Sequence, residues 1–331
     1  MTSKTRIDLL FGFLGSGKTT LARRILEEYG PKRRLALIVN EFGDVGVDGE
    51  ILEGNDIDLI QLSSGCLCCT LKGSLMAAVD ELASKQQLDH IVIEATGVAE
   101  PEEMLTSFSE PGFLERHDVG PVVTVVDTPK YLKIREMLGP FYEAQVEKAD
   151  LLILNKLDLA SAELVEDVRE ELEELNEDAV VRYAERCDID ILEILDGPTS
   201  GALARYGTGE AARQAGNAHH DHDHAHDGHD HDHDHGGLHA PAESFVLDVT
   251  APMDQAALTG LFAKAPEGLW RAKGFVRVDG GDRLVQFAMG ELEITESEAR
   301  DRHYLVFIGD ELDRDWFERE VAGAYATEGA A

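Results

Sequence analysis

The 331-residue sequence has no apolar run near the roughly 20 residues that a membrane-spanning helix needs. Basic residues are scarce as well: 30 lysines and arginines stand against 65 aspartates and glutamates, so the formal net charge is −35. Because nucleic acids and anionic membranes bind basic surfaces, this balance argues against both as partners. The N-terminal apolar stretch leads into a glycine-rich loop without a signal-peptide cleavage site, so we expect a cytoplasmic protein.

Cysteine is also rare, and three of the four cysteines, Cys66, Cys68 and Cys69, fall within four residues. This spacing indicates metal binding or redox chemistry rather than a framework of structural disulfides. Thiolates in a loop can converge on an ion such as Zn²⁺, with Glu41 or, as a weaker candidate, His117 completing the site. Two alternatives stay open: a redox pair between Cys66 and Cys69, and three small buried hydrophobic side chains.

Short runs rich in valine, isoleucine and leucine alternate with amphipathic stretches over residues 6–203. The pattern predicts an α/β fold with a mostly parallel sheet and helices on both faces. The expected strands are Ile7–Phe11, Leu35–Val39, Ile57–Leu62, His90–Glu94, Val122–Val126 and Leu151–Asn155. The expected helices are Thr19–Tyr29, Ser74–Lys85 and an exposed, acidic Ala162–Asn176.

The composition divides the chain into three segments. Residues 1–203 are expected to form the α/β domain, and residues 204–242 a linker that has no large apolar side chains at its centre and is expected to be disordered. Residues 243–331 are expected to form a smaller α+β domain with an antiparallel sheet. Its predicted strands are Ser244–Val249, Trp270–Val278, Arg283–Met289 and Tyr304–Gly309, and its predicted helices are Met253–Ala265 and Asp313–Ala324.

A phosphate-binding loop is predicted at Gly12–Thr19, which reads GFLGSGKT and fits G-x-x-x-x-G-K-[ST] between an apolar strand and a helix. The glycines let the backbone wrap around phosphates, and the amides at the start of the helix face the anion. Lys18 is expected to reach the β- and γ-phosphates, and Thr19 to ligate Mg²⁺. The candidate phosphate-binding residues are Gly12, Gly15, Ser16, Gly17, Lys18, Thr19 and Thr20.

A guanine-reading loop is predicted at Asn155–Asp158, which reads NKLD at the end of a strand. The carboxylate of Asp158 can accept both the N1–H and the exocyclic amine of guanine, a pair of donors that adenine does not present. We expect Asn155 to support the loop and Lys156 to lie over the purine plane. A solvated loop is the alternative interpretation.

A second magnesium-site element is predicted where another strand ends in Glu94-Ala95-Thr96-Gly97. Glu94 would hold Mg²⁺ through water, and Gly97 would let a backbone amide reach the γ-phosphate. The alternative is a strand that ends in an N-capping turn. Lys18 and Glu94 are therefore the catalytic candidates, and no residue stands out as a hydrolytic base.

Taken in order, GFLGSGKTT, VNEFGDVGVDGEIL, GCLCC, EATGVAEP, VVTVVDT and NKLDL resemble the CobW-like GTPases, SIMIBI-class P-loop proteins often called metallochaperones. The later stretch GLWRAKGFVRVDG is similar to the C-terminal domain of that family. The resemblance implies that Cys66, Cys68 and Cys69 form a metal site and that Glu41 belongs to a switch region. It also implies that Glu94 and Gly97 form the second switch. Members of the family are linked to zinc delivery, cobalamin synthesis and nitrile hydratase activation.

The linker is rich in possible metal ligands, since ten histidines and six aspartates lie between His219 and His239. Imidazole binds Zn²⁺, Ni²⁺ and Cu²⁺, which favours metal binding by the linker; the alternative is a solvated acidic linker whose histidines bind nothing. The sequence thus predicts a slow GTPase with Mg²⁺ that transfers a metal ion, zinc before cobalt, to a client metalloprotein. The alternatives are an activator that inserts cobalt or iron into one enzyme or cofactor, and a passive metal store. A homo-oligomer is compatible with each of these functions.

Overall fold

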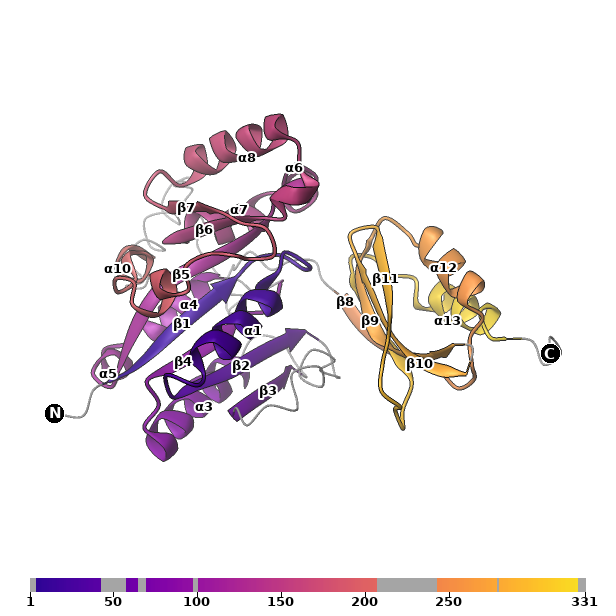
Figure 1. Ribbon diagram of the computed structural model, residues 1–331, viewed down its shortest axis with the longest axis horizontal. Helices are drawn as coiled ribbons and strands as arrows, with labels where there is room; N and C mark the ends of the chain where they lie inside the picture. Colours follow the sequence, from indigo (N-terminus) through magenta and orange to yellow (C-terminus); the bar gives the residue numbers. More distant parts are fainter. Residues whose placement is uncertain are drawn as a thin grey trace, which may run out of the picture.

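The computed structural model describes residues 4–42, 58–64, 70–97, 101–206, 243–278 and 280–326. These residues form two domains, each built on its own β-sheet, which lie side by side in the ribbon view (Figure 1). None of the helices within these ranges is long and apolar enough to cross a membrane. The predicted combination of an α/β domain with a smaller α+β domain is confirmed.

The first sheet has seven strands in the order β3-β2-β4-β1-β5-β6-β7, and every described pair is parallel. Its central strands β1, β4, β5 and β6 are almost wholly buried, as their valine-, isoleucine- and leucine-rich sequences require. The strands are β1 (Thr5–Phe11), β2 (Leu35–Phe42), β3 (Asp58–Ser64), β4 (His90–Glu94), β5 (His117–Asp127), β6 (Leu151–Asn155) and β7 (Val180–Tyr183). Their parallel order places all carboxyl ends at one edge of the sheet.

Helices cover both faces of this sheet, and alternate residues of each strand pack into separate hydrophobic clusters (Figure 1). Leu10 and Leu37 pack with α1 and α9, whereas Leu9 and Ile38 pack with α3, α4 and α10. The helices are α1 (Lys18–Tyr29), α3 (Thr70–Gln86), α4 (Pro101–Phe108), α5 (Pro111–Leu114), α6 (Tyr131–Leu138), α7 (Pro140–Glu147), α8 (Ala162–Leu175), α9 (Leu192–Leu195) and α10 (Gly201–Tyr206), with 3-10 turns η1 (Thr128–Lys130) and η2 (Leu157–Leu159).

The second sheet is antiparallel, with the strand order β11-β10-β9-β12-β8. Helices α12 and α13 pack on one face of it, where Leu261, Val276, Phe307 and Phe317 form the centre of a core. The elements are β8 (Glu243–Asp248), α12 (Gln255–Ala263), β9 (Leu269–Val278), β10 (Gly281–Ala288), β11 (Glu291–Glu296), β12 (Tyr304–Gly309) and α13 (Arg314–Gly323).

The opposite face of the second sheet packs against the first domain. Phe13, within the predicted phosphate loop, lies with its ring centroid 6.0 Å from that of Trp270 on β9. Lys130 donates a hydrogen bond of 3.0 Å to the carbonyl of Ala288 and forms an ion pair of 2.7 Å with Glu291. The two domains therefore share part of one hydrophobic core.

Two strands are absent from the sequence prediction, β7 and β11, and both lie at the edge of a sheet. The strand β7 has four residues and is half exposed, so it lacks the apolar run of a central strand. The strand β11 reads ELEITE, and glutamate is uncommon in strands except at edges, where charge prevents further pairing. Helix α10 ends at Tyr206, beyond the predicted domain end at residue 203.

Candidate nucleotide and metal sites

The phosphate loop connects β1 to α1, which begins at Lys18. Two of its glycines make contacts that no other residue allows. A Cβ on Gly12 would lie 2.3 Å from the carbonyl oxygen of Val125, and one on Gly17 would lie 2.5 Å from Asn155 Nδ2. Both also have positive φ, +135° and +118°. The loop is thus held against the neighbouring strands β5 and β6, with its amides at the start of α1.

Lys18 is buried in this loop, with its ammonium donating hydrogen bonds to the carbonyls of Gly12 (2.7 Å) and Phe13 (3.1 Å). Burial lowers the pKa of Lys18 to about 8, although the nearby carboxylate of Glu94 opposes the shift. In the part of the chain that the structure describes, the buried hydroxyl of Ser16 has no hydrogen-bond partner. A cation and an unpaired hydroxyl in a cradle of backbone amides fit an anionic ligand such as a phosphate.

The two predicted magnesium ligands lie together. Thr19 at the start of α1 donates a hydrogen bond of 2.7 Å from Oγ1 to Oε1 of Glu94, which ends the adjacent strand β4. Glu94 Oε2 is buried, and the described residues provide it with no hydrogen-bond partner. Burial raises the pKa of Glu94, while Lys18 and the bond from Thr19 act in the opposite direction. A hydroxyl beside a carboxylate is a donor set that fits Mg²⁺.

Gly97, predicted to belong to a second switch, lies directly against the phosphate loop. A Cβ at this position would come within 2.7 Å of the backbone nitrogen of Leu14. Thr20 also lines the cavity above the loop, together with Thr19 and Glu94. The segment that follows Gly97 lies outside the described residues.

Asn155 connects the phosphate loop to the loop after β7. Its buried amide donates a 2.8 Å hydrogen bond to the carbonyl of Ser16 and accepts one of 2.8 Å from the backbone N–H of Cys187. Lys156, in a left-handed conformation with φ +63°, forms a 2.7 Å ion pair with Asp127 and lines the cavity. Asp158 is exposed in η2. The carboxyl edge of the sheet thus brings NKLD close to the phosphate loop.

The structure adds Cys187 to this site, which the sequence did not reveal. Cys187 is buried, with its thiol 3.4 Å from the carbonyl of Gly17. Burial raises the pKa of Cys187 to about 12, so the side chain stays a neutral thiol that packs behind the loop. A single cysteine in an irregular loop has no sequence pattern that predicts such a contact.

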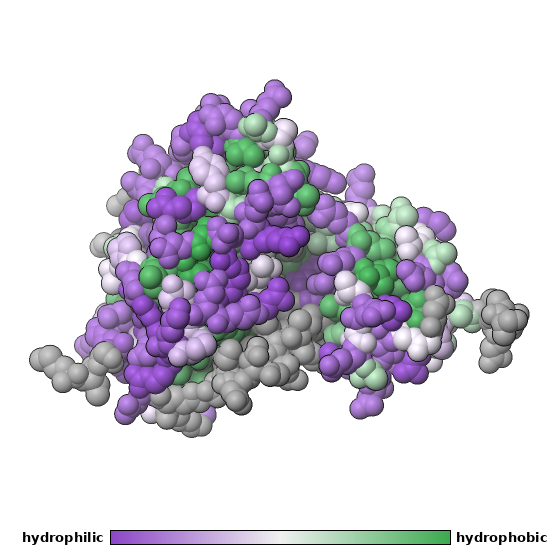
Figure 2. All heavy atoms as spheres, viewed as in Figure 1, coloured by the Kyte–Doolittle hydropathy of each residue, from purple (hydrophilic) through white to green (hydrophobic). Residues whose placement is uncertain are grey.

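Above the phosphate loop is a cavity of about 740 Å³ that both domains line. Its walls include Lys18, Thr19 and Glu94 from the first domain, and Arg271 and Lys273 from β9 of the second. The space-filling view shows a mostly hydrophilic surface that is hollowed between the domains (Figure 2). The volume falls within the range of about 300–1,000 Å³ typical of ligand pockets.

The predicted cysteine site lies outside the described residues, since Cys66, Cys68 and Cys69 fall between β3 and α3. The structure does place the backbone of Glu41 in β2, opposite Ser63 of β3, at the carboxyl edge where the cysteine segment begins. His117 starts β5 opposite Thr5, at the other edge of the sheet, and its Nε2 lies 2.9 Å from Asp80. Among the described residues, no group of three or more histidines, cysteines or carboxylates could hold a metal ion.

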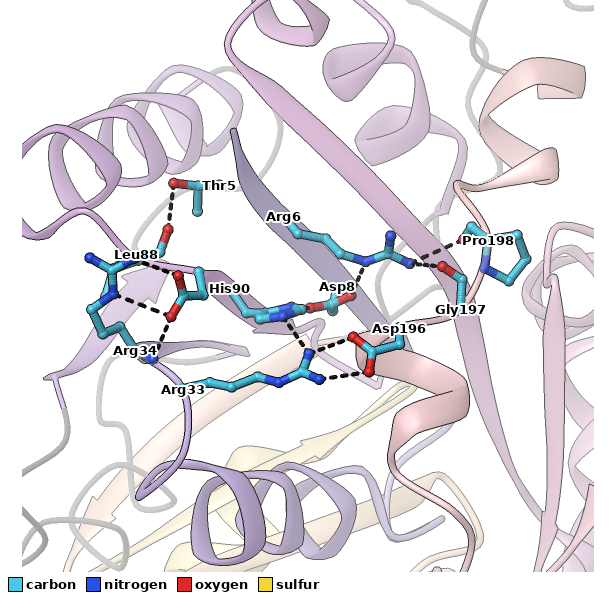
Figure 3. Close-up of polar contacts among 11 residues, drawn as sticks. Thr5, Arg6, Asp8, Arg33, Arg34, Leu88, His90, Asp196, Gly197 and Pro198 are labelled. Carbon is cyan, nitrogen blue, oxygen red and sulfur yellow. Dashed lines mark hydrogen bonds and ion pairs between the residues drawn. The ribbon is translucent and has the colours of Figure 1, made fainter. Parts of the chain in front are cut away.

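A second polar cluster lies at the amino edge of the sheet, away from the phosphate loop (Figure 3). The fully buried carboxylate of Asp8 contacts His90 Nδ1 at 2.8 Å and Arg6 Nε at 3.3 Å. Arg33 lies 3.1 Å from His90 Nε2 and forms two 2.6 Å hydrogen bonds with Asp196. These contacts join β1 and β4 to the segments that follow α1 and α9, so the cluster braces the end of the domain opposite the cavity.

Each of the two domains matches a known protein family. Residues 7–182 match the family described as CobW/HypB/UreG, nucleotide-binding domain, and residues 242–324 match the cobalamin synthesis protein cobW C-terminal domain. The chain is 31% identical over 317 residues to zinc chaperone CobW of Sinorhizobium sp. The aligned region covers 85% of this chain and 84% of that protein.

Two further relatives match over shorter segments. Zinc chaperone YjiA of Escherichia coli (strain K12) is 36% identical over 194 residues, 56% of this chain and 59% of that protein. The zinc-regulated GTPase metalloprotein activator 1 of Schizosaccharomyces pombe is 36% identical over 202 residues, 57% of this chain and 48% of that protein. The crystal structure of Zn(II)-bound YjiA GTPase from E. coli aligns with 98% of this chain and all of that one, at 24% identity and a TM-score of 0.45.

Proposed function

The chain belongs to the CobW family of P-loop GTPases. We propose that it hydrolyses GTP and couples this reaction to the transfer of a metal ion, with zinc as the favoured metal, to a client protein. The observation that carries the proposal is the group of Lys18, Thr19 and Glu94 at the carboxyl edge of the sheet. The strand β2, which carries Glu41, ends at this same edge, and the cysteine segment begins there.

In this proposal, different residues of the site contact the phosphates, the guanine base and Mg²⁺. The phosphate loop binds the phosphates through its amides, and Lys18 leaves the carbonyls of Gly12 and Phe13 to contact the β- and γ-phosphates. Asn155 holds the loop in shape, and Asp158 accepts the two donors of guanine. Mg²⁺, held by Thr19 and through water by Glu94, would supply positive charge to the phosphate oxygens.

Hydrolysis adds water to the γ-phosphorus and breaks its bond to the oxygen that bridges to the β-phosphate, which yields GDP and inorganic phosphate. The side chains that contact the cavity offer positive charge and orientation. We assign no hydrolytic base among the described residues and expect slow turnover in the absence of metal or client.

The metal ion is the cargo rather than a resident cofactor. Cys66, Cys68 and Cys69 offer thiolates, which suit Zn²⁺ and also Co²⁺, and Glu41 in β2 lies at the edge where that segment begins. Three relatives are named as zinc chaperones or zinc-regulated activators, which favours zinc. In this proposal GTP sets the thiolates for tight binding, and hydrolysis releases the ion to the client.

The test is the zinc affinity of the purified protein in three states: without nucleotide, with a non-hydrolysable GTP analogue and Mg²⁺, and with GDP. We expect the GTP-analogue state to bind zinc most tightly, and by linkage zinc must tighten the binding of the analogue by the same factor. A C66S/C68S/C69S variant serves as control, because it should lose zinc binding and keep nucleotide binding. Equal zinc affinity in all three states would refute the coupling, and absence of GTP hydrolysis with any metal would favour a passive store.

A further inference from the structure

The face of the second sheet that looks at the phosphate loop carries positive charge at its centre. On β9, Ala272, Val276 and Val278 pack into the core with α12 and α13, so Arg271 and Lys273, on either side of Ala272, project to the opposite face, toward the first domain. Strand register places Ala288 and Ile308 on either side of Arg271. This is the same face that buries Trp270 and Phe275 against the first domain.

This face reaches the phosphate loop directly. A Cβ on Gly15, in the middle of the loop, would lie 3.0 Å from the Cβ of Ala288. Since Ala288 is the cross-strand neighbour of Arg271, the guanidinium projects from beside the point where the sheet touches the loop. Arg271, Lys273, Lys18 and Thr19 line one cavity.

The electrostatics of the site agree with this placement. Burial is the main cause of the low pKa of Lys18, and the positive charge of Arg271 lowers it further. Burial raises the pKa of Glu94, and Lys18, Thr19 and Arg271 counteract that rise. Arg271 is thus close enough to influence both groups that mark the phosphate and magnesium end of the cavity, whereas Lys156 marks the base end.

Both positively and negatively charged side chains line the cavity. Glu94 and, on the edge strand β11, Glu291 and Glu293 also line the cavity, and Glu291 is already paired with Lys130. The triphosphate of GTP carries about four negative charges at neutral pH, and a guanidinium can contact phosphate oxygens through two parallel N–H groups.

We propose that Arg271 of the C-terminal domain contacts the terminal phosphate of bound GTP, so that this domain completes the nucleotide site with an arginine supplied by the same chain. The inference rests on the proposed GTPase function and assigns to the C-terminal domain a role in the reaction itself. Lys273, buried at the next position on the same face, adds charge behind the contact. An arginine placed in this way stabilises the charge that spreads over the γ-phosphate oxygens during transfer.

The experiment compares Arg271→Ala and Arg271→Lys with a matched control, Arg277→Ala. Arg277 projects from the same face of β9, is exposed, and pairs with Asp282 away from the cavity. Dissociation constants for a non-hydrolysable GTP analogue and for GDP, both with Mg²⁺, are measured by fluorescence titration. Single-turnover hydrolysis is measured in parallel.

Arg271→Ala should weaken binding of the GTP analogue by about 10- to 100-fold and that of GDP by less than about threefold, since only GTP has the terminal phosphate. Arg271→Lys should keep part of the effect, because an ammonium cannot form the two-pronged contact, and Arg277→Ala should match the wild type. Equal losses for both nucleotides, or no loss, would overturn the assignment and leave the proposed function intact. Should Arg271→Ala fail to fold, Arg271→Lys tests the assignment by the same comparison, the loss of affinity for the GTP analogue relative to the loss for GDP. Failure of the wild type to bind either nucleotide would instead overturn the proposed function.

Discussion

Replacing Asn155 by alanine should weaken nucleotide binding as well as stability, because this one amide joins the phosphate loop to the loop that carries Cys187. The substitution removes the 2.8 Å hydrogen bond to the carbonyl of Ser16 and the 2.8 Å hydrogen bond from the N–H of Cys187. Both bonds are buried, since Asn155 is 2% exposed. The partners that remain would have no protein group to replace the lost amide.

The cost follows from these two contacts. Each hydrogen bond contributes about 1 kcal/mol net, and a buried partner left unsatisfied costs about 1–3 kcal/mol, so the free energy of unfolding should fall by about 2–4 kcal/mol. For a domain of this size that corresponds to a fall of about 4–16 °C in the unfolding midpoint. The carbonyl of Ser16 belongs to the loop that holds the phosphates, so its release should also weaken GDP binding by about tenfold or more.

Thermal unfolding without nucleotide gives the first quantity, and fluorescence titration below the unfolding transition gives the second. Asn176→Ala is the matched control, because Asn176 donates to the carbonyls of Val146 (2.8 Å), Glu147 (3.0 Å) and Ala149 (3.0 Å), away from the cavity. It should lose similar stability and keep nucleotide affinity. If both variants bound GDP as the wild type does, the amide of Asn155 would have no part in shaping the loop.

Four further predictions follow. Gly17→Ala should abolish nucleotide binding in a titration, since its Cβ would lie 2.5 Å from Asn155 Nδ2 at φ +118°; wild-type affinity would contradict the loop geometry. At about pH 9, calorimetry in buffers of different ionisation enthalpy should detect proton uptake on GDP binding, because the pKa of Lys18 is about 8 in the free protein and a phosphate favours the charged ammonium. For the same reason the free energy of unfolding without nucleotide should rise from about pH 8 towards 10.5, where the unfolded chain still holds the proton, and a flat profile would contradict the burial of Lys18. Deleting residues 219–239 should lower the metal bound per chain by mass spectrometry and leave GTP hydrolysis measurable, whereas unchanged stoichiometry would exclude the linker from metal handling.

The parts of the site that could be predicted from the sequence are those whose chemistry is local. GFLGSGKT carries its glycines, lysine and threonine within one short segment, and the structure places Lys18 against the loop carbonyls and Thr19 beside Glu94. The pairing of Thr19 with Glu94 was also predictable, because β1 leads into the loop and helix that carry Thr19 and the strand β4, parallel to β1, ends at Glu94, so both residues lie at one edge of the sheet.

The contributions of Cys187, Ala288 and Arg271 could not be predicted, because each depends on packing between segments far apart in the chain. Arg271 lies in GLWRAKGF, a run that predicts a strand and gives no sign of which face meets the other domain. Its orientation follows from the register with β10 and β12, and the register depends on the core formed with α12 and α13. For His117 the sequence suggested a possible metal ligand, but the structure places it at the amino edge of the sheet, away from the edge where the cysteine segment begins.

Because Ala288 lies against Gly15, the position of the C-terminal domain and the conformation of the phosphate loop are coupled. A ligand held by Lys18 on one side and Arg271 on the other bridges both domains, so its binding must favour the arrangement in which they touch. Linkage then requires the reverse: whatever separates β9 and β10 from the loop weakens binding of the bridging ligand by the same factor. GDP, which lacks the phosphate assigned to Arg271, would favour that arrangement less. Hydrolysis would thereby loosen the C-terminal domain at the same carboxyl edge where the cysteine segment begins, which gives metal release and domain contact a common cause.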